Sequence, residues 1–264
     1  MEVRRALYGS VQAGALWHKL MSKTLVDFGY VPNTYDPCVY NKVNAAGVQC
    51  TVLLFVDDIL ATCVDITVID DLYSHLCTVF KVVKRNTDAK FSFLGMEIDT
   101  TVSGIATLTQ RGYVNGILSD YNITKSAVTP ARTNLYEIDE NSPLLDTKQK
   151  ALFYSAVYKL MYLGKRTRPD ILQASIYLTT RTHHPTKQDM GKLYRVMEYL
   201  NYRPDRALTF RKSTQGGDDY QLYAYVDASH AIYPDYKSQT GCVVMLGSSS
   251  IYCKSSKQKL NGKS

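Results

Sequence analysis

The stretch Cys50-Thr51-Val52-Leu53-Leu54-Phe55-Val56-Asp57-Asp58-Ile59-Leu60-Ala61-Thr62-Cys63-Val64 decides the fold. Two runs rich in β-branched and apolar residues, 50–56 and 59–64, are separated only by Asp57 and Asp58. This pattern predicts two strands joined by an acidic hairpin tip. The first run is continuously apolar, which is typical of a buried strand.

The adjacent carboxylates of Asp57 and Asp58 allow two interpretations. Aspartate is a common turn residue, so an arbitrary Asp-Asp pair is in most cases a solvated turn. Two neighbouring carboxylates also repel each other unless water solvates them or a cation binds. Mg²⁺ prefers carboxylate oxygens, and two-metal phosphoryl transfer needs carboxylates at the end of a rigid element. The buried strand before the tip favours the metal-binding interpretation.

Outward from the hairpin, hydrophobic periodicity and turn residues predict an α+β fold instead of a Rossmann repeat. We expect helices over residues 13–28, 68–80, 110–118, 148–163, 169–181 and 186–201. We expect further strands over residues 38–43, 91–99, 105–109, 221–226, 241–246 and 250–253. Residues 122–146 have low periodicity and are predicted to be a linker.

Composition excludes several classes of protein. The 264 residues are 45% hydrophobic with a net charge of +7, which excludes a disordered or collagen-like chain. No apolar run approaches the roughly 18–20 residues of a membrane span, and the first ten residues lack the apolar core of a secretory signal. We therefore expect an intracellular, cytoplasmic protein without a membrane partner.

The spacing of metal-ligating residues and the distribution of charge are also informative. The six cysteines form no C-x-x-C pair and the five histidines form no metal-binding ladder, so free thiols are expected and zinc is not. Residues 147–215 carry 14 basic and 4 acidic side chains. A strongly basic segment suits binding of a polyanion, although a solvated helical surface explains the charge equally well.

Five blocks of the sequence occur in a recognisable order. They are Leu7-Tyr8-Gly9-Ser10-Val11-Gln12-Ala13 with Trp17; Phe55-Val56-Asp57-Asp58; Phe93-Leu94-Gly95-Met96-Glu97-Ile98; Tyr154 to Leu163 with Thr167-Arg168-Pro169-Asp170-Ile171; and Tyr225-Val226-Asp227-Ala228-Ser229 with Lys237-Ser238, Thr240-Gly241 and Ser255-Ser256-Lys257-Gln258. This ordered set resembles the copia-type retrotransposon Pol polyprotein over nearly the whole chain.

The resemblance implies an α+β fold in three parts. Residues 1–146 would be a partial reverse transcriptase palm and thumb with antiparallel hairpins. Residues 147–215 would be a basic helical connection, and residues 216–264 the truncated β start of a ribonuclease H-like domain. The implied partners are an RNA template, a DNA primer or RNA–DNA hybrid, and deoxynucleotides.

The resemblance also implies roles for acidic residues. Asp57 would bind Mg²⁺ at the phosphates of the incoming nucleotide and at the primer terminus, with Asp58 as its catalytic acidic neighbour. Asp227 would be the first metal ligand of the ribonuclease H domain. Read without its neighbours, an aspartate at a strand end is more often a turn or cap, and the flanking motif is what favours the metal-binding role of Asp227.

Other residues would contact nucleic acid. Gly9 and Gln12 would contact the nucleotide or template. Phe93, Leu94 and Gly95 would grip the primer end, although Phe93 and Leu94 also suit an ordinary core. A basic cluster between two predicted helices could reach phosphates without reading bases. It consists of Lys165, Arg166 and Arg168, and Arg168 would equally suit a cap on a neighbouring helix.

The carboxylate sets that the family uses are incomplete in this sequence. The family's polymerases use a further aspartate upstream of the first block, where the only acid here is Glu2. The only acid after Asp227 is Asp235. We therefore expect this chain alone to polymerise little or nothing, because two-metal catalysis fails without its full ligand set. The leading hypothesis is a fragment of an RNA-directed DNA polymerase, and the alternative is a non-catalytic, retrotransposon-derived remnant that binds nucleic acid.

Overall fold

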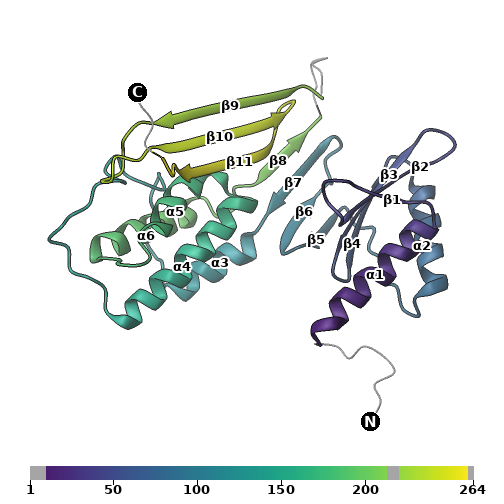
Figure 1. Cartoon of the computed structure of the whole chain (residues 1–264), viewed down its shortest axis with the longest axis horizontal. Helices are drawn as coiled ribbons and strands as arrows, with labels where there is room; N and C mark the ends of the chain where they lie inside the picture. Colours follow the sequence, from purple (N-terminus) through teal and green to yellow (C-terminus); the bar gives the residue numbers. More distant parts are fainter. Residues whose placement is uncertain (1–9, 213–219, 261–264) are drawn as a thin grey trace, which may run out of the picture. The chain divides into compact units, whose positions relative to one another are not determined.

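The structure, a computed structural model, describes residues 10–212 and 220–260 and divides into two compact units (Figure 1). The first unit ends at Asp88 and the second begins at Ala89. Both units combine helices with antiparallel sheets, which confirms the predicted α+β class. Across the described ranges, no helix has both the length and the apolar character needed to cross a bilayer.

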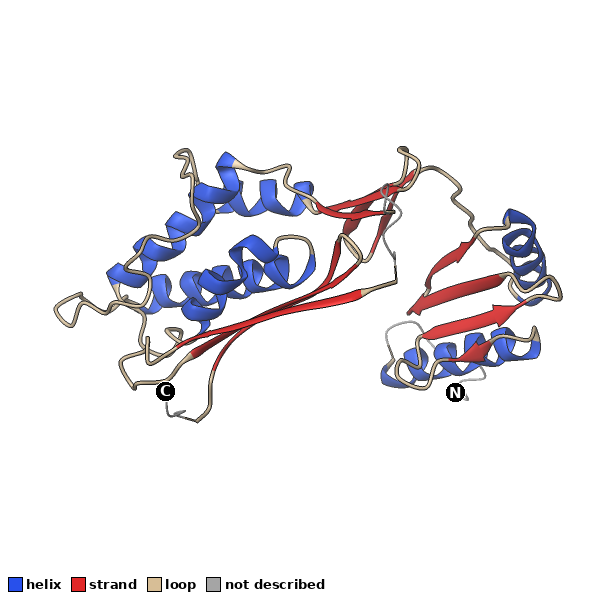
Figure 2. Ribbon diagram, turned by 90° about the horizontal axis from the view of Figure 1, so that it is seen from above, coloured by secondary structure: helices blue, strands red, loops and turns tan. Residues whose placement is uncertain are grey.

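The first unit is a four-stranded antiparallel sheet with two helices. Its elements are α1 (Val11–Asp27), β1 (Val31–Pro32), β2 (Val39–Val43), β3 (Gln49–Phe55), β4 (Asp58–Cys63) and α2 (Ile66–Val79), with the strands in the order β1-β2-β3-β4. Cys50, Val52 and Leu54 alternate along β3 and are buried, because successive strand residues point to opposite faces. They pack with Leu25 of α1 and Leu72 of α2, so both helices cover the same face (Figure 2).

The second unit contains two antiparallel sheets and a layer of helices. Its elements are β5 (Lys90–Phe93), β6 (Met96–Asp99), β7 (Ile105–Thr109), α3 (Arg111–Asp120), α4 (Thr147–Arg166), a 3-10 turn (Pro169–Ile171), α5 (Leu172–Thr179), α6 (Lys187–Tyr202), β8 (Leu208–Arg211), β9 (Leu222–Ser229), β10 (Gln239–Leu246) and β11 (Ser249–Lys257). The sheet orders are β5-β6-β7-β8 and β11-β10-β9, and α5 packs against β11.

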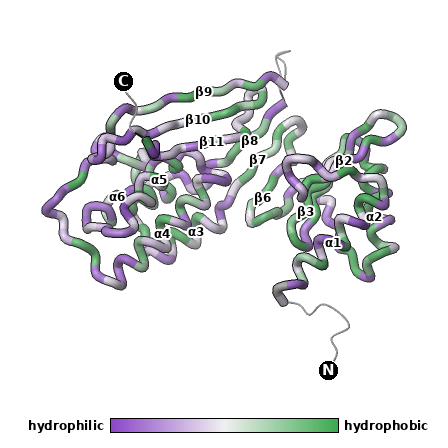
Figure 3. The backbone as a smooth tube through the Cα atoms, in the orientation of Figure 1, coloured by the Kyte–Doolittle hydropathy of each residue, from purple (hydrophilic) through white to green (hydrophobic). Residues whose placement is uncertain are grey.

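Helices α4 and α6 start at well-formed caps and share one core. Asp146 and Gln149 form a capping box at α4, and Thr186 and Asp189 form another at α6. Hydrophobic and hydrophilic positions alternate around both helices (Figure 3), which is the pattern of helices with one buried face. The fully buried residues of this core include Phe153, Val157, Leu160, Leu178, Leu193, Val196 and Leu200.

Residues 122–146 contain no helix or strand, as predicted, but they do not link two domains. They are fastened to α6: the Ala127 amide donates to the Glu198 carbonyl at 3.0 Å, and Arg195 Nε donates to the Thr129 carbonyl at 2.9 Å. Residues 122–146 and α6 thus lie in the same compact unit, which begins at Ala89. The functional boundaries at residues 146 and 215 stay predictions.

Three other elements differ from the prediction. The expected strand 91–99 is two strands, because Leu94 and Gly95 have φ values of 53° and 72° and form a two-residue hairpin turn. The expected helix 169–181 begins as the 3-10 turn and ends at Thr179. Strand β8 was not predicted, and it pairs with β7 more than 95 residues earlier in the chain.

Candidate metal and nucleic-acid sites

Asp57 and Asp58 lie at the tip of the β3–β4 hairpin. Phe55 pairs with Asp58, so the loop consists of Val56 and Asp57, and Asp58 is the first residue of β4. This corrects the prediction, which placed both aspartates between the strands. Both side chains are exposed. Neither carboxylate forms a hydrogen bond or ion pair with any residue that the structure describes.

Trp17 of α1 contacts the tip of the β3–β4 hairpin. Its indole Nε1 donates to the Val56 carbonyl at 2.6 Å, and its ring lies 5.2 Å from the ring of Phe80, which follows α2. Val56 has a φ of 53°, a left-handed conformation that costs a non-glycine residue roughly 1–2 kcal/mol. Backbone strain of this kind concentrates at functional sites.

We expect Val56→Asn to raise the free energy of unfolding of the first unit by about 1 kcal/mol, because asparagine tolerates the left-handed region better than a β-branched residue. Thermal unfolding followed by the fluorescence of Trp17, the only tryptophan, would show a higher Tm. The control is Val64→Asn, at a 93% exposed valine without positive φ, which should bring no gain. A Tm that Val56→Asn leaves unchanged or lowers would show that the tip is unstrained.

The donor chemistry of the tip fits Mg²⁺. This ion keeps several waters and is commonly held by one or two carboxylates together with substrate phosphates. Asp57 and Asp58 offer two exposed carboxylates without competing partners, and a cation relieves their mutual repulsion. No cluster of three or more His, Cys, Asp or Glu residues able to hold a metal occurs in the described ranges. The two aspartates are therefore the ligands that this chain offers at the tip.

Gln12 lies in the first turn of the helix that touches the tip. Its side chain is exposed, and it precedes Trp17 by five residues, about 7.5 Å along the axis of α1. The first unit thus brings the helix of Gln12 beside the hairpin of Asp57 and Asp58. Gly9, the other predicted nucleotide contact, lies outside the described residues.

Phe93, Leu94 and Gly95 form the β5–β6 turn in the second unit. Phe93 is buried, with 8% of its surface exposed, so its side chain packs in the interior, as the core alternative for this residue predicts. The Leu94 carbonyl accepts a 3.4 Å hydrogen bond from the hydroxyl of Tyr162 on α4. Gly95 is exposed at the turn. Gly95 and the half-buried Leu94 form the accessible part of this turn, and a role of the three residues at the primer end stays a prediction.

Lys165 and Arg166 form the last turn of α4. The helix continues three residues beyond its predicted end, so they do not lie between two helices. Positive side chains at a helix C-terminus interact favourably with its dipole. Both are exposed, and neither has an ion-pair partner among the described residues. The Arg166 guanidinium lies 5.5 Å from the ring of Tyr162.

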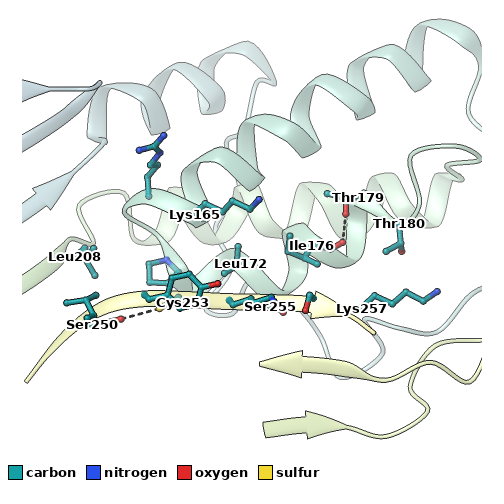
Figure 4. Close-up of a pocket in the computed structure, with 17 residues that line it drawn as sticks. Lys165, Leu172, Ile176, Thr179, Thr180, Leu208, Ser250, Cys253, Ser255 and Lys257 are labelled. Carbon is teal, nitrogen blue, oxygen red and sulfur yellow. Dashed lines mark hydrogen bonds between the residues drawn. The ribbon is translucent and has the colours of Figure 1, made fainter. Parts of the chain in front are cut away.

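Lys165 and Arg166 also line a cleft of about 590 Å³ between α4, α5 and β11 (Figure 4). Lys254 and Lys257 of β11 line it as well, and no carboxylate is among its lining residues. Lys257 is paired with Asp235 at 2.7 Å, whereas Lys254 has no ion-pair partner within the described chain. Apolar lining residues are Pro169, Leu172, Ile176, Leu208 and Ile251. The cleft therefore combines positive charge with apolar surface.

Arg168 does not belong to this basic surface. Only 1% of it is exposed, and its guanidinium donates to both carboxylate oxygens of Asp170, at 3.0 Å each, and to the Arg203 carbonyl at 2.8 Å. Asp170 also accepts a 2.7 Å bond from the Tyr199 hydroxyl. Burial by itself would raise the pKa of Asp170, but Arg168 and Tyr199 bring this pKa below its usual value. The predicted phosphate contact at Arg168 is thus corrected to a structural ion pair.

Asp227 lies within β9 and not at a strand end. It is the sixth of eight strand residues, is exposed, and its Oδ1 accepts a 2.8 Å bond from the Ala228 amide. Asp235 is engaged by Lys257 and Lys237, and the hydrogen bond from Lys257 lowers the pKa of Asp235. In the described ranges, Asp227 therefore belongs to no group of three or more side chains able to hold a metal ion.

Sequence reasoning missed three groups of residues at these sites. The contact of Trp17 with the tip and the cleft position of Lys254 arise from chain segments far apart in sequence, so no local signal could reveal them. Tyr154, Tyr158 and Tyr162 recur at every fourth residue along α4. Residues at this spacing lie on one face of a helix, so the sequence alone could have revealed these tyrosines as a group.

A family model described as "Reverse transcriptase (RNA-dependent DNA polymerase)" matches residues 1–133, half of the chain. The chain belongs to this family. The matched range includes α1, the Asp57–Asp58 tip and the Leu94-Gly95 turn. Membership in the reverse transcriptase family confirms the resemblance seen in the sequence.

Three similar proteins are retrotransposon polyproteins. The chain is 30% identical over 262 residues to the retrovirus-related Pol polyprotein from transposon RE1 of Arabidopsis thaliana, a match that covers 98% of the chain and 17% of that protein. It is 31% identical over 261 residues to the RE2 polyprotein of the same plant, covering 97% and 17%. It is 25% identical over 278 residues to the transposon Ty1-NL2 Gag-Pol polyprotein of Saccharomyces cerevisiae, covering 98% and 15%.

The chain thus spans about a sixth of the length of these curated relatives. Their similarity places this chain with the copia-type retrotransposon Pol polyproteins. No solved structure gives a significant match.

Proposed function

We propose that this chain contributes the metal-binding hairpin and part of the nucleic-acid-binding surface of an RNA-directed DNA polymerase. One observation carries the proposal: two exposed carboxylates without competing partners project from a hairpin tip that Trp17 fixes. When bound there, Mg²⁺ would supply charge neutralisation for the phosphates of the incoming deoxynucleotide. Asp57 would hold the ion, Asp58 would add a second carboxylate, and Gln12 would contact the nucleotide or template.

The second unit would hold the RNA template and DNA primer or their hybrid. Lys165 and Arg166 present unpaired positive charge at the end of α4, which suits contact with phosphates. Gly95 and Leu94 would lie at the primer end. The three antiparallel strands β9, β10 and β11 agree with the start of a ribonuclease H-like domain, in which Asp227 would bind metal.

Two-metal nucleotidyl transfer requires more ligands than two neighbouring carboxylates, because both ions must be held at a fixed spacing. Asp57 and Asp58 would therefore act together with ligands beyond those described here. We accordingly keep the prediction that the 264-residue chain by itself extends a primer little or not at all.

Salt dependence tests the nucleic-acid surface. We expect the chain to bind a short RNA–DNA hybrid with an affinity that falls steeply as salt rises, because each phosphate contact releases condensed counterions. Lys165→Gln/Arg166→Gln should lower the slope of log affinity against log salt by about 1–2. Fluorescence anisotropy of a labelled hybrid at several salt concentrations measures this slope.

The matched control is Lys148→Gln/Lys187→Gln, which removes two exposed charges outside the cleft. It should change the slope less than Lys165→Gln/Arg166→Gln does. If both double substitutions lower the slope equally, binding depends on the overall positive charge and not on a defined site. Binding that does not depend on salt would reject the nucleic-acid surface.

A second candidate is a non-catalytic, retrotransposon-derived protein that binds nucleic acid. The positively charged cleft favours it, because this surface is present whether or not the tip holds a metal. Binding of divalent ions at Asp57 and Asp58 separates the two candidates, since only the polymerase role requires it.

A further inference from the structure

Three tyrosines and an arginine follow the solvent face of α4. Tyr154, Tyr158, Tyr162 and Arg166 are four residues apart, so they lie one above another on the helix. The tyrosine stripe is defined here as the first three of them. The opposite face of α4 is buried, as at Leu160, and solvent faces of helices normally carry charged or polar residues. Two neighbouring exposed rings, those of Tyr154 and Tyr158, in line with the half-buried Tyr162, are therefore unusual on a helix and point to a ligand.

The rings are fixed by neighbouring side chains. Tyr154 and Tyr158 are 53% and 37% exposed, and their ring centroids are 4.5 Å apart. Tyr162 meets the ring of Tyr113 edge-on at 5.4 Å, and its hydroxyl donates to the Leu94 carbonyl. The guanidinium of Arg166 lies against the ring of Tyr162. Aromatic surfaces held in place in this way bind planar ligands at a low entropic cost.

The charge at the end of the stripe indicates an anionic ligand. Arg166 extends the row, Lys165 precedes it in the last turn of α4, and Lys254 lies on the β11 side of the cleft. None of the three pairs with a carboxylate in the described part of the chain. A ligand that matches both features carries regularly spaced negative charge and flat apolar faces.

Single-stranded nucleic acid has this combination, because its phosphates meet the cations while its unpaired bases can stack on aromatic rings and on arginine. Bases in a duplex are stacked on each other and cannot reach the rings. An acidic peptide would satisfy the cations but lacks a planar group at each step.

We propose that the tyrosine stripe and Arg166 form a stacking track for single-stranded RNA or DNA that leads to Lys165 and Lys254. This inference rests on the proposed function and adds the unpaired strand as the ligand. The twelve helical steps from Tyr154 to Arg166 span about 18 Å, which matches about five nucleotides at the ~3.4 Å spacing of a stacked strand.

The test uses the complete 264-residue chain and two labelled twelve-nucleotide strands, one with bases and one with abasic sugars at every position but the same phosphates. Fluorescence anisotropy should show that the base-bearing strand binds about fivefold or more tightly than the abasic strand. Tyr154→Ala/Tyr158→Ala should remove most of this difference and leave binding of the abasic strand unchanged. Alanine favours helix, so α4 should remain folded.

Two control variants sharpen the result. Tyr154→Phe/Tyr158→Phe keeps the rings and should retain the preference for bases. Tyr35→Ala removes a 95% exposed tyrosine outside the second unit and should have no effect. Equal loss in the phenylalanine and alanine variants would assign the effect to the hydroxyls and overturn stacking.

The failures of the two proposals are distinguishable. If the wild-type chain binds both strands equally, and Lys165→Gln/Arg166→Gln weakens both, the nucleic-acid surface stands and the stacking track is refuted. If the chain binds neither strand nor the hybrid, both proposals fail. If the tyrosine variants instead abolish self-association and leave nucleic-acid binding unchanged, the stripe is a protein interface and the track is rejected.

Discussion

Arg168→Ala is expected to lower the free energy of unfolding of the second unit by about 3 kcal/mol, the lower end of the range for breaking a buried ion pair. The guanidinium bridges Asp170 and the Arg203 carbonyl with almost no exposure to water. Its removal leaves the Asp170 carboxylate with the Tyr199 hydroxyl and the more distant Arg206, at 2.7 and 3.4 Å. Urea unfolding followed by circular dichroism measures the change.

Arg166→Ala is the matched control for Arg168→Ala. Arg166 lies two residues earlier, is exposed and forms no ion pair within the described chain, so its loss should change stability by less than about 0.5 kcal/mol. Similar small effects of both substitutions would mean that Arg168 is solvated and available to ligands. That outcome would restore the phosphate contact first predicted for it.

Asp57→Asn/Asp58→Asn is expected to abolish the stabilisation of the first unit by divalent ions. Ligands that bind only the folded state raise stability, by about 1.4 kcal/mol at ten times the dissociation constant. For a unit of this size such a gain raises the Tm by several degrees. Thermal unfolding monitored through Trp17 should therefore show a Mn²⁺-dependent shift in the wild-type chain and none in the double variant.

Asp70→Asn/Asp71→Asn provides the control for charge. These two aspartates are also adjacent, exposed and in the first unit, so the charge change is the same. Asp70 pairs with Arg85, but an ion pair at this exposure contributes little to stability. The control should keep the Mn²⁺-dependent shift. If it loses the shift as fully as the tip variant does, the ion responds to overall charge and not to the tip.

Local signals explain which parts of the fold could be predicted. The β3–β4 hairpin, α4 and α6 carry their own periodicity and turn or cap residues, and the structure contains all three. Strand β8 has only four residues and exists because it pairs with β7, so its partner cannot be read from its own sequence. The turn at Leu94 and Gly95 was not predicted, because nothing in the sequence indicates that Leu94 adopts a positive φ.

The candidate site shows the same division. The position of Asp57 and Asp58 at a hairpin tip follows from the flanking apolar runs, whereas the Trp17 contact that fixes the tip joins residues 39 positions apart. In the sequence, Arg168 appears only as one of three neighbouring basic residues, with Lys165 and Arg166. Its burial depends on Asp170, Tyr199 and the Arg203 carbonyl meeting around it, which only tertiary packing determines.

Terbium luminescence sensitised by Trp17 tests the Asp57–Asp58 tip as a metal site most directly. Tb³⁺ binds the same carboxylate oxygens as Mg²⁺, and the indole of Trp17 touches the residue next to Asp57, so excitation of the only tryptophan reports an ion at this place. We predict emission that Mg²⁺ competes away, that Asp57→Asn/Asp58→Asn abolishes and that Asp70→Asn/Asp71→Asn retains. Absence of sensitised emission, or emission that survives loss of both tip carboxylates, would contradict a metal-binding role for the hairpin.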